Sequence, residues 1–188
     1  MKIKLSDLVI MHEPIPESGI VIDVGTYKGE YVDLITKRFN CNVFCYEPDP
    51  QLYRNLVSRF EAFPKISISN TAIGNTGVRK LYLSKNGLAN SFYPEWAKSK
   101  LSIDVTVQLL SSLVKNLAKV DILKLNCEGA EYEILDDLIE NNLLDRFGEI
   151  LLQFHKTENK RRKWALEDKL EEKFNRVYDY KIQLWKKR

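Results

Sequence analysis

An apolar run that ends at a glycine stands near the start of the chain: Ile20-Val21-Ile22-Asp23-Val24-Gly25-Thr26-Tyr27-Lys28-Gly29. Its β-branched residues predict a strand over 20–24 that is covered on both faces of a parallel sheet. Apolar residues then recur at helical spacing over 30–39, and a second strand-like run follows over 42–47. The sequence therefore predicts a β-α-β unit with a glycine loop after its first strand.

The same alternation continues along the rest of the chain. We expect further strands at 66–69, 105–109, 120–125, 149–154 and 177–184, and a polar strand or hairpin around 79–83. Helices are expected at about 49–61, between 109 and 120, at 130–141 and at 160–174. Strands that alternate with helices predict an α/β fold, a three-layer sandwich around a mostly parallel central sheet. The ligands of such sheets bind at the carboxyl ends of the strands.

Composition indicates a globular chain that needs no disulfide bonds. Of its 188 residues 44% are hydrophobic and 29% are charged, which excludes a disordered or collagen-like chain. The three cysteines are an odd number, no leader sequence is visible, and the apolar runs are far shorter than the roughly twenty residues of a membrane span. We expect a cytoplasmic protein with no transmembrane segment.

No repeat and no Gly/Ser/Pro-rich linker divides the chain. We therefore expect a single domain over 1–188, with a ligand-binding core at about 18–157 and a C-terminal helix and strand over 158–188. Basic residues gather in this last part, because 156–188 carries 12 basic and 6 acidic side chains against 17 and 20 in 1–155. The basic runs could contact phosphate groups or could form a solvated helix face.

The glycine loop and the end of the second strand indicate the type of ligand. Asp23, Gly25 and Gly29 have the spacing D-x-G-x-x-x-G, which differs from the G-x-G-x-x-G of pyrophosphate-binding loops. An acidic residue before the first glycine repels phosphate and suits a cation. Glu47 ends the second strand, where a carboxylate can accept hydrogen bonds from both ribose hydroxyls. These features favour S-adenosylmethionine (SAM), with NAD as the alternative.

Three more clusters follow strands at the same predicted edge. The turn 70–74 could bind an adenine edge or could be an ordinary turn. Lys124, Asn126 and Glu128 alternate along one face of a strand, where three polar groups need either a function or a buried ion pair. His155 follows the strand 149–154, and a histidine with an unperturbed pKa can accept a proton at neutral pH.

In this order the clusters resemble the motifs of the FkbM family of SAM-dependent methyltransferases, over roughly residues 18–157. The family's D-x-G-x-x-x-G matches 23–29, its E-P-x-P matches 47–50, its N-x-A-[IV]-G matches 70–74, and its K-x-D-x-E-G-x-E matches 124–131 with one change. The chain departs from the family at Asn126 and Gln153, where the family has carboxylates, and at Leu109-Leu110, where it has Leu-Asp. Because Mg²⁺ and Ca²⁺ prefer charged oxygens, we expect no metal site and metal-independent chemistry.

The resemblance implies a Rossmann-like class I methyltransferase that transfers a methyl group from SAM to a hydroxyl of a sugar or glycan, such as a deoxyhexose, and releases S-adenosylhomocysteine (SAH). His155 would be the base, with Glu128 as the second candidate, and Asn126 would orient the acceptor hydroxyl. The implied cofactor-binding residues are Asp23, Gly25, Thr26, Tyr27, Gly29, Glu47, Pro48, Asn70, Ala72 and Ile73, and the implied substrate-binding residues are Lys124, Ser91 and Trp96.

Three other functions stay open. A nucleic-acid methyltransferase guided by the basic tail predicts salt-sensitive binding, although the rest of the chain is acidic. A non-catalytic SAM-binding domain predicts affinity without turnover, and the glycine spacing argues against an NAD-linked oxidoreductase. The compact chain also suggests either a large, chain-end acceptor or a module that works beside glycosyltransferase domains in a longer polypeptide.

Overall fold

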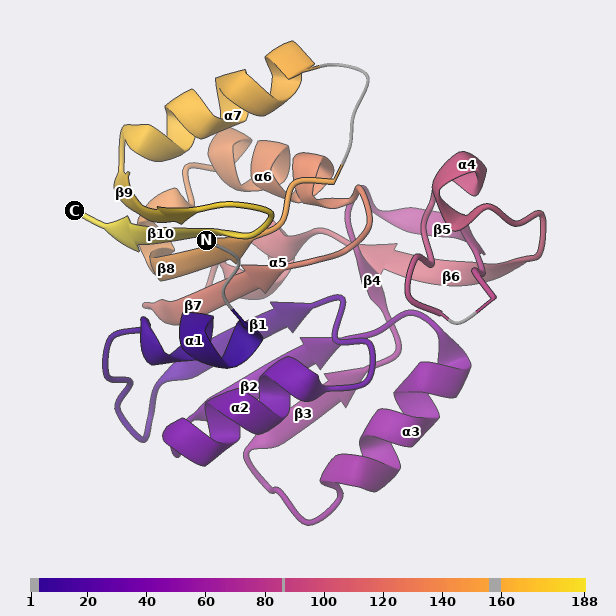
Figure 1. Ribbon diagram of the computed structural model, residues 1–188, viewed down its shortest axis with the longest axis horizontal. Helices are drawn as coiled ribbons and strands as arrows, with labels where there is room; N and C mark the ends of the chain where they lie inside the picture. The colour runs from indigo at the N-terminus through magenta and orange to yellow at the C-terminus, as the bar shows by residue number, and fades with distance from the viewer. Residues whose placement is uncertain (1–3, 86, 156–159) are drawn as a thin grey trace.

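A seven-stranded sheet forms the middle of the protein in a computed structural model that describes residues 4–85, 87–155 and 160–188 (Figure 1). Residues 156–159 of the basic tail and residue 86 lie outside the described residues. The strand order is β3-β2-β1-β7-β8-β10-β9. The bounds are β1 (Ile20–Val24), β2 (Asn42–Tyr46), β3 (Ile66–Ser69), β7 (Val120–Leu125), β8 (Phe147–Leu152), β9 (Phe174–Asp179) and β10 (Gln183–Lys187). β1, β2, β3, β7 and β8 pair in parallel, and β10 is antiparallel to both of its neighbours.

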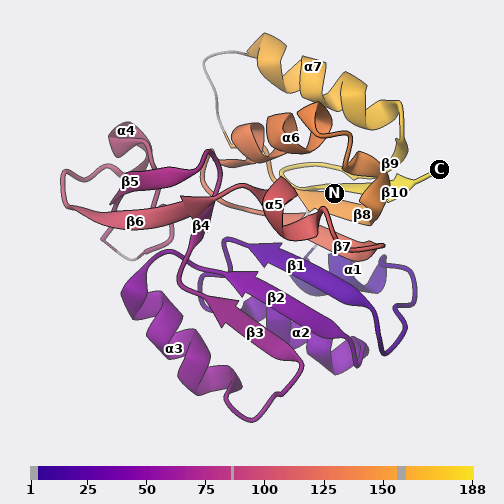
Figure 2. The same cartoon turned by 180° about the vertical axis from the view of Figure 1, so that it is seen from behind.

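Helices cover both faces of this sheet. α1 (Leu5–Ile10), α2 (Glu30–Arg38) and α3 (Pro50–Phe60) share one apolar cluster with the sheet, and α5 (Leu110–Val114), α6 (Glu131–Glu140) and α7 (Lys160–Glu171) share another. Figures 1 and 2 show the two groups of helices on opposite sides of the strands. A 3₁₀ helix, η1 (Leu144–Arg146), precedes β8. The predicted three-layer α/β fold with a mostly parallel sheet is confirmed.

The helix after β2 shows how the local sequence fixes an element. The Asp49 side chain accepts hydrogen bonds from the backbone of Gln51 at 2.8 Å and of Leu52 at 3.3 Å, which satisfies two amides at the start of α3. Pro50 stands in the first helical turn, where its missing N–H is not needed. This helix start follows directly on Glu47 and so fixes the turn that carries this carboxylate.

A small second sheet, not predicted from the sequence, stands beside the main one. It has the order β4-β6-β5, with β4 (Ala72–Ile73), β5 (Gly77–Tyr82) and β6 (Ser102–Gln108), and α4 (Pro94–Ala97) lies between β5 and β6 in the chain. The strands expected at 79–83 and 105–109 therefore pair with each other and do not join the main sheet. β4 has only two residues, too few for any periodic pattern.

The single strand expected at 177–184 is wrong, because the chain forms a hairpin there. β9 and β10 run antiparallel on either side of a turn at 180–182. β9 is a sheet edge with mostly exposed residues, and the turn contains neither Gly nor Pro, so the sequence carries no signal for it. Lys181 lies in the turn between these two strands of the main sheet.

The helix α1, also unpredicted, is tied to the sheet by a buried polar cluster. His12 Nδ1 lies 2.5 Å from Glu149 Oε2, Tyr31 Oη lies 3.1 Å from His12 Nε2, and the backbone N–H of Glu13 donates to Glu149 at 2.8 Å. His12 thus lies in the packing between α1, α2 and β8. Within the described ranges, no helix combines the length and apolar character needed to cross a membrane.

Candidate functional site

A cleft of about 710 Å³, its open mouth included, lies where β1, β2 and β7 end. The loops after these strands and β4 form its walls. Of the residues singled out from the sequence, it is lined by Gly25, Tyr27, Glu47, Pro48, Ala72, Ile73, Ser91, Asn126 and Glu128. A concave site at the carboxyl ends of the strands of an α/β sheet is typical of small-molecule and cofactor sites. The carboxyl edge of the sheet therefore brings most of the expected site residues together.

The glycine loop passes very close to the loop after β7. Gly25 has φ +77°, and a Cβ there would stand 2.2 Å from the carbonyl oxygen of Asn126. Only glycine fits this position without a shift of the backbone. A second hollow of about 620 Å³ shares Gly25, Tyr27 and Asn126 with the cleft and is also lined by Thr26 and Lys124. The loop thus separates two adjoining hollows.

Asp23 and Lys124 form a buried ion pair that supports this loop. Lys124 Nζ lies 2.6 Å from Asp23 Oδ1 and donates to the carbonyl of Gly25 at 2.7 Å. Asp23 is fully buried and does not line the cleft. The buried ion pair considered from the sequence is therefore present, and the Lys124 ammonium is used to hold the loop.

Two other expected cofactor residues shape the loops without lining the cleft. Gly29 stands at the start of α2 with φ +83°, packed against the ring of Phe60. The side-chain amide of Asn70 donates to the carbonyls of Glu47 at 2.9 Å and Pro48 at 3.0 Å. Gly29 and Asn70 therefore fix the backbone conformation of the loops around the site.

Glu47 faces the cleft with two acceptor sites already used. Its oxygens accept the backbone N–H of Tyr27 at 2.8 Å and of Asp49 at 3.0 Å. A carboxylate has about four lone-pair positions, so it can accept two more hydrogen bonds. Burial raises the pKa of Glu47 to about 7, and the two amide donors reduce this effect.

Unpartnered buried oxygens show that the site fits a ligand with hydrogen-bond donors. Asn126 Oδ1 and Asp23 Oδ2 are buried and have no hydrogen-bond partner among the described residues. Buried acceptors are normally satisfied, and Asn126 lines both the cleft and the second hollow. An ammonium group such as that of the methionine part of SAM would supply the missing donor.

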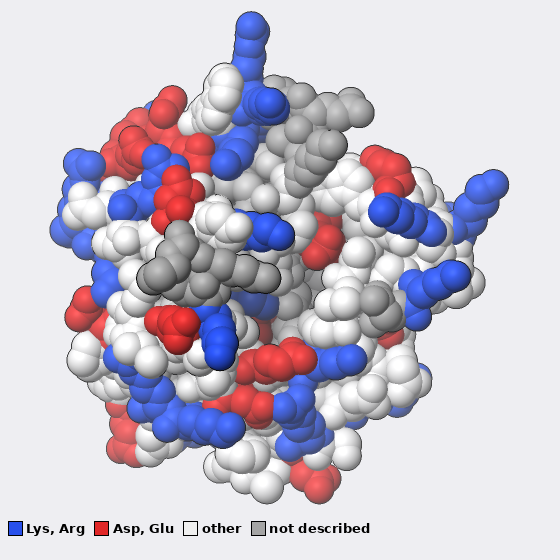
Figure 3. All heavy atoms as spheres, in the orientation of Figure 1, with Lys and Arg blue, Asp and Glu red and all other residues white. Residues whose placement is uncertain are grey.

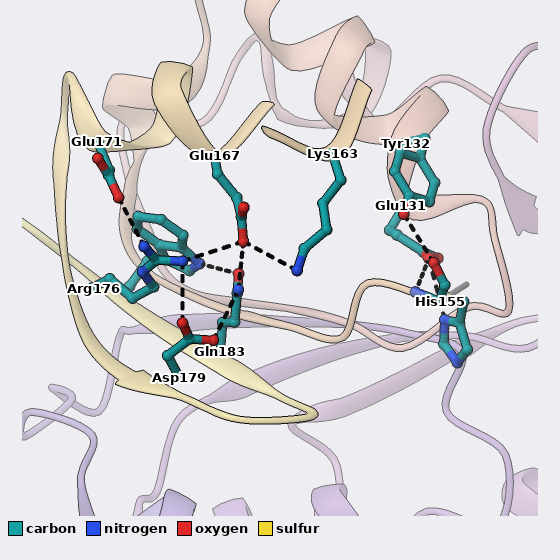
Figure 4. Close-up of polar contacts among 10 residues, drawn as sticks. Glu131, Tyr132, His155, Lys163, Glu167, Glu171, Arg176, Asp179 and Gln183 are labelled. Carbon is teal, nitrogen blue, oxygen red and sulfur yellow. Dashed lines mark hydrogen bonds and ion pairs between the residues drawn. The ribbon is translucent and has the colours of Figure 1, made fainter. Parts of the chain in front are cut away.

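His155 lies between two carboxylates at the same edge, those of Glu128 and Glu131, and Figure 4 shows its contact with Glu131. Its Nε2 lies 3.0 Å from Glu128 Oε1 and its Nδ1 lies 3.2 Å from Glu131 Oε1. Burial alone would lower the pKa of His155, but the hydrogen bonds to Glu128 and Glu131 outweigh it and raise the pKa to about 9. With its pKa raised in this way, the His155 ring is mostly protonated at pH 7, where an unperturbed histidine would be mostly neutral.

Glu131 is a site residue to which the sequence analysis gave no role. It is fully buried, and its Oε1 also accepts the backbone N–H of His155 at 2.7 Å. Its Oε2 accepts the N–H of Gly129 at 2.9 Å. One carboxylate thus joins the loop after β7 to the loop after β8. The last glutamate of the 124–131 motif was the available signal.

The two remaining substrate candidates contact the protein itself. Ser91 is buried at the cleft wall and donates its hydroxyl to the carbonyl of Glu128 at 2.7 Å, so its proton is already used. The ring of Trp96 covers Gly129, where a Cβ would stand 2.3 Å from the ring, and its centroid lies 6.3 Å from that of His155. Trp96 therefore forms part of the wall around His155. Across the described ranges, no three His, Cys, Asp or Glu side chains are grouped so as to hold a metal ion.

Comparisons with known proteins point to one family and one fold. The model of the methyltransferase FkbM domain matches residues 23–182, which extends past the limit of about 157 expected from the sequence. No curated protein matches the chain significantly.

Solved structures are similar in fold at low sequence identity. A putative rRNA methylase from Clostridium thermocellum is 10% identical with a TM-score of 0.61, and the match covers 100% of this chain and 98% of that one. An rRNA methylase from Streptococcus thermophilus is 12% identical with a TM-score of 0.56 over 97% and 93% of the two chains. TrmK of M. capricolum, solved with SAH, is 11% identical with a TM-score of 0.50 over 100% and 69%.

Proposed function

Because the chain belongs to the FkbM family of SAM-dependent methyltransferases, we propose that it methylates a hydroxyl group of a sugar or glycan acceptor, deoxyhexoses included. The observation that carries this proposal is the His155–Glu128 pair beside the cleft. A sugar hydroxyl hardly ionises at neutral pH, so its methylation needs a group that takes the proton. When bound, SAM supplies an electrophilic methyl group.

Different residues of the cleft would bind the ribose, the adenine and the methionine part of SAM. Glu47 would accept the ribose hydroxyls, and Ala72 and Ile73 would contact the adenine. The unpartnered oxygen of Asn126 and the backbone of the Gly25 loop would hold the methionine part. Asp23 acts indirectly, through Lys124 and the carbonyl of Gly25.

His155 is the proposed base and Glu128 the second candidate. In the neutral ring, an Nδ1–H that donates to Glu131 leaves the lone pair on Nε2. The amide of Gln153 lies 3.0 Å from Nε2, so the acceptor hydroxyl would take the place of this amide to give up its proton. A base with a raised pKa is strong, but only a small fraction of it is neutral at pH 7.

The pH dependence of methyl transfer to a panel of sugars separates the two bases. If His155 is the base, kcat/KM rises about tenfold per pH unit from pH 7 and levels near pH 9. A profile with no rise between pH 7 and pH 9 would rule out His155 as the base and leave Glu128. Calorimetry with SAM and with NAD comes first: protein that binds no SAM would contradict the proposal, and SAM binding without transfer to any sugar would favour a binding domain.

Nucleic-acid methylation is the main alternative, since two of the similar structures are titled as rRNA methylases. Seven basic side chains of the tail form ion pairs within the protein: Arg162, Lys163, Lys169, Lys173, Arg176, Lys186 and Lys187. Figure 3 shows blue and red side chains mixed on the face over α7 and the C-terminal hairpin. A continuous basic surface is the usual mark of nucleic-acid binding. We therefore expect no salt-sensitive binding to RNA.

The proposal also covers the setting of the protein. Cys41, Cys45 and Cys127 are free thiols, which supports a cytoplasmic location. Phe92 packs against the apolar clusters of both the main and the small sheet, which supports a single domain over 1–188. Glycosyltransferase domains remain the proposed partners, since they supply sugar acceptors.

A further inference from the structure

A third hollow, of about 750 Å³ with its open mouth, adjoins His155 and shares no lining residue with the cofactor cleft. The end of β8, the helix α7 and the turn of the β9–β10 hairpin form its walls. Three cationic side chains line it, those of His155, Lys163 and Lys181, and none of its described lining residues is Asp or Glu. The hairpin turn therefore reaches a hollow beside the candidate base.

Two of these three cations already have carboxylate neighbours: His155 pairs with Glu128 and Glu131, and Lys163 approaches Glu167. Glu131 is fully buried, and Glu128 lines the cofactor cleft and not this hollow. Glu167 has a side chain only 10% exposed and accepts Gln183 Nε2 at 2.6 Å and Arg176 Nη1 at 3.2 Å (Figure 4).

The ammonium groups of Lys163 and Lys181 can contact a ligand, because neither forms a short ion pair among the described residues. Lys163 Nζ stands 3.4 Å from Glu167 Oε1, a longer contact than that carboxylate makes with Gln183. Lys181, in the turn, has no ion pair among the described residues, whereas seven other basic side chains of the tail do. Ammonium groups form their strongest hydrogen bonds with carboxylate and phosphate oxygens.

We propose that this hollow binds an anionic group, a carboxylate or a phosphate, that the sugar acceptor carries. The inference rests on the proposed function, because it places the acceptor against His155. The hollow and the candidate base share the His155 ring, so a sugar whose hydroxyl meets Nε2 can place a charged substituent between Lys163 and Lys181. The phenol of Tyr180 and the amide of Gln153 line the same hollow and suit sugar hydroxyls.

Calorimetric titration of the SAH-loaded protein tests this. The probes are glucuronate, glucose 1-phosphate and the neutral methyl glucoside. We expect at least one anion to bind about tenfold more tightly than methyl glucoside, and to bind more weakly as NaCl is added. The difference between the two anions tells a carboxylate from a phosphate. Lys163→Gln and Lys181→Gln should each weaken the tighter anion about three- to tenfold.

Lys169→Gln is the matched control, because Lys169 lies on α7, pairs with Glu172 at 2.7 Å and does not line the hollow. Its anion affinity should be unchanged. The proposal is overturned if neither anion binds more tightly than methyl glucoside, or if Lys169→Gln weakens binding as much as Lys181→Gln. Protein that binds SAH but no anion overturns only this inference. Protein that fails to bind SAH overturns the proposed function. The same titration without SAH then shows whether the hollow binds an anion in the absence of the cofactor product.

Discussion

At the scale of single residues, two groups at the carboxyl edge have pKa values displaced for different reasons. Burial raises the pKa of Glu47 to about 7, so its environment favours the neutral acid. For His155, burial is outweighed by two carboxylate partners, and its environment favours the charged ring. Each group therefore changes charge in a pH range that is easily reached in solution.

Glu47 makes SAM binding depend on pH. Only the ionised carboxylate can accept both ribose hydroxyls, and its pKa of about 7 means that it is mostly protonated at pH 6. We expect the affinity for SAM to rise up to about tenfold between pH 6 and pH 8. Calorimetry at these pH values measures it. Glu47→Gln should bind SAM more weakly and with no pH dependence, whereas an unchanged slope in this variant would contradict the assignment.

Glu131 sets the charge and the orientation of His155. Glu131→Gln removes the carboxylate that holds Nδ1, so the pKa of His155 should fall by about one unit or more from its raised value of about 9. NMR titration of the ring protons measures this directly, since the chain has only two histidines and His155→Gln assigns the signals. The control is Glu133→Gln, in the same helix but paired with Arg79 at 2.6 Å. Equal pKa values in all three proteins would contradict the role.

At the scale of elements, the ion pair between β1 and β7 connects two neighbouring central strands. Asp23 and Lys124 face each other in the parallel register, and both are buried. A buried pair of this kind adds little to stability relative to apolar residues, but loss of one partner leaves a buried charge uncompensated. The glycine loop depends on the pair, because Lys124 also holds the carbonyl of Gly25.

Lys124→Met should therefore lower the free energy of unfolding by about 3–5 kcal/mol. Urea denaturation measures it. The double variant Asp23→Leu/Lys124→Met should recover most of the loss, because no unpaired charge remains. Lys119→Met is the control, since Lys119 has a 64% exposed side chain and pairs with Asp121, and it should change stability by less than about 1 kcal/mol. A Lys124→Met protein as stable as this control would rule out a stabilising role of the Asp23–Lys124 ion pair in this loop.

At the scale of the whole molecule, His155 links global stability to pH. Its pKa is raised from 6.5 to about 9 on folding, so its contribution is fully present below pH 6.5 and is lost as pH rises through about 9. The free energy of unfolding should fall by up to about 3 kcal/mol over this range. The difference between the protein and His155→Gln isolates this contribution in urea titrations at several pH values. If the unfolding free energies of the two proteins changed with pH in parallel, His155 would have the same pKa in the folded and unfolded states, which would contradict the prediction.

Much of the molecule follows from local sequence. The largely apolar runs of β1, β2, β7 and β8 are visible without the structure, because strands covered on both faces are mostly apolar. Parallel strands then place Gly25, Glu47, Glu128 and His155 at one edge by topology alone. The sequence therefore determined the fold and the family, and it places the candidate site at this edge of the sheet.

Only the tertiary structure decided what these side chains contact. Whether Lys124 meets a ligand or Asp23, and whether His155 is neutral or charged, depends on neighbours in space that spacing along the chain does not reveal. The hairpin turn that brings Lys181 beside His155 is equally invisible, because an exposed edge strand has no apolar period. Charge and hydrogen bonding act over a few ångströms through space, whereas a sequence pattern records only distance along the chain.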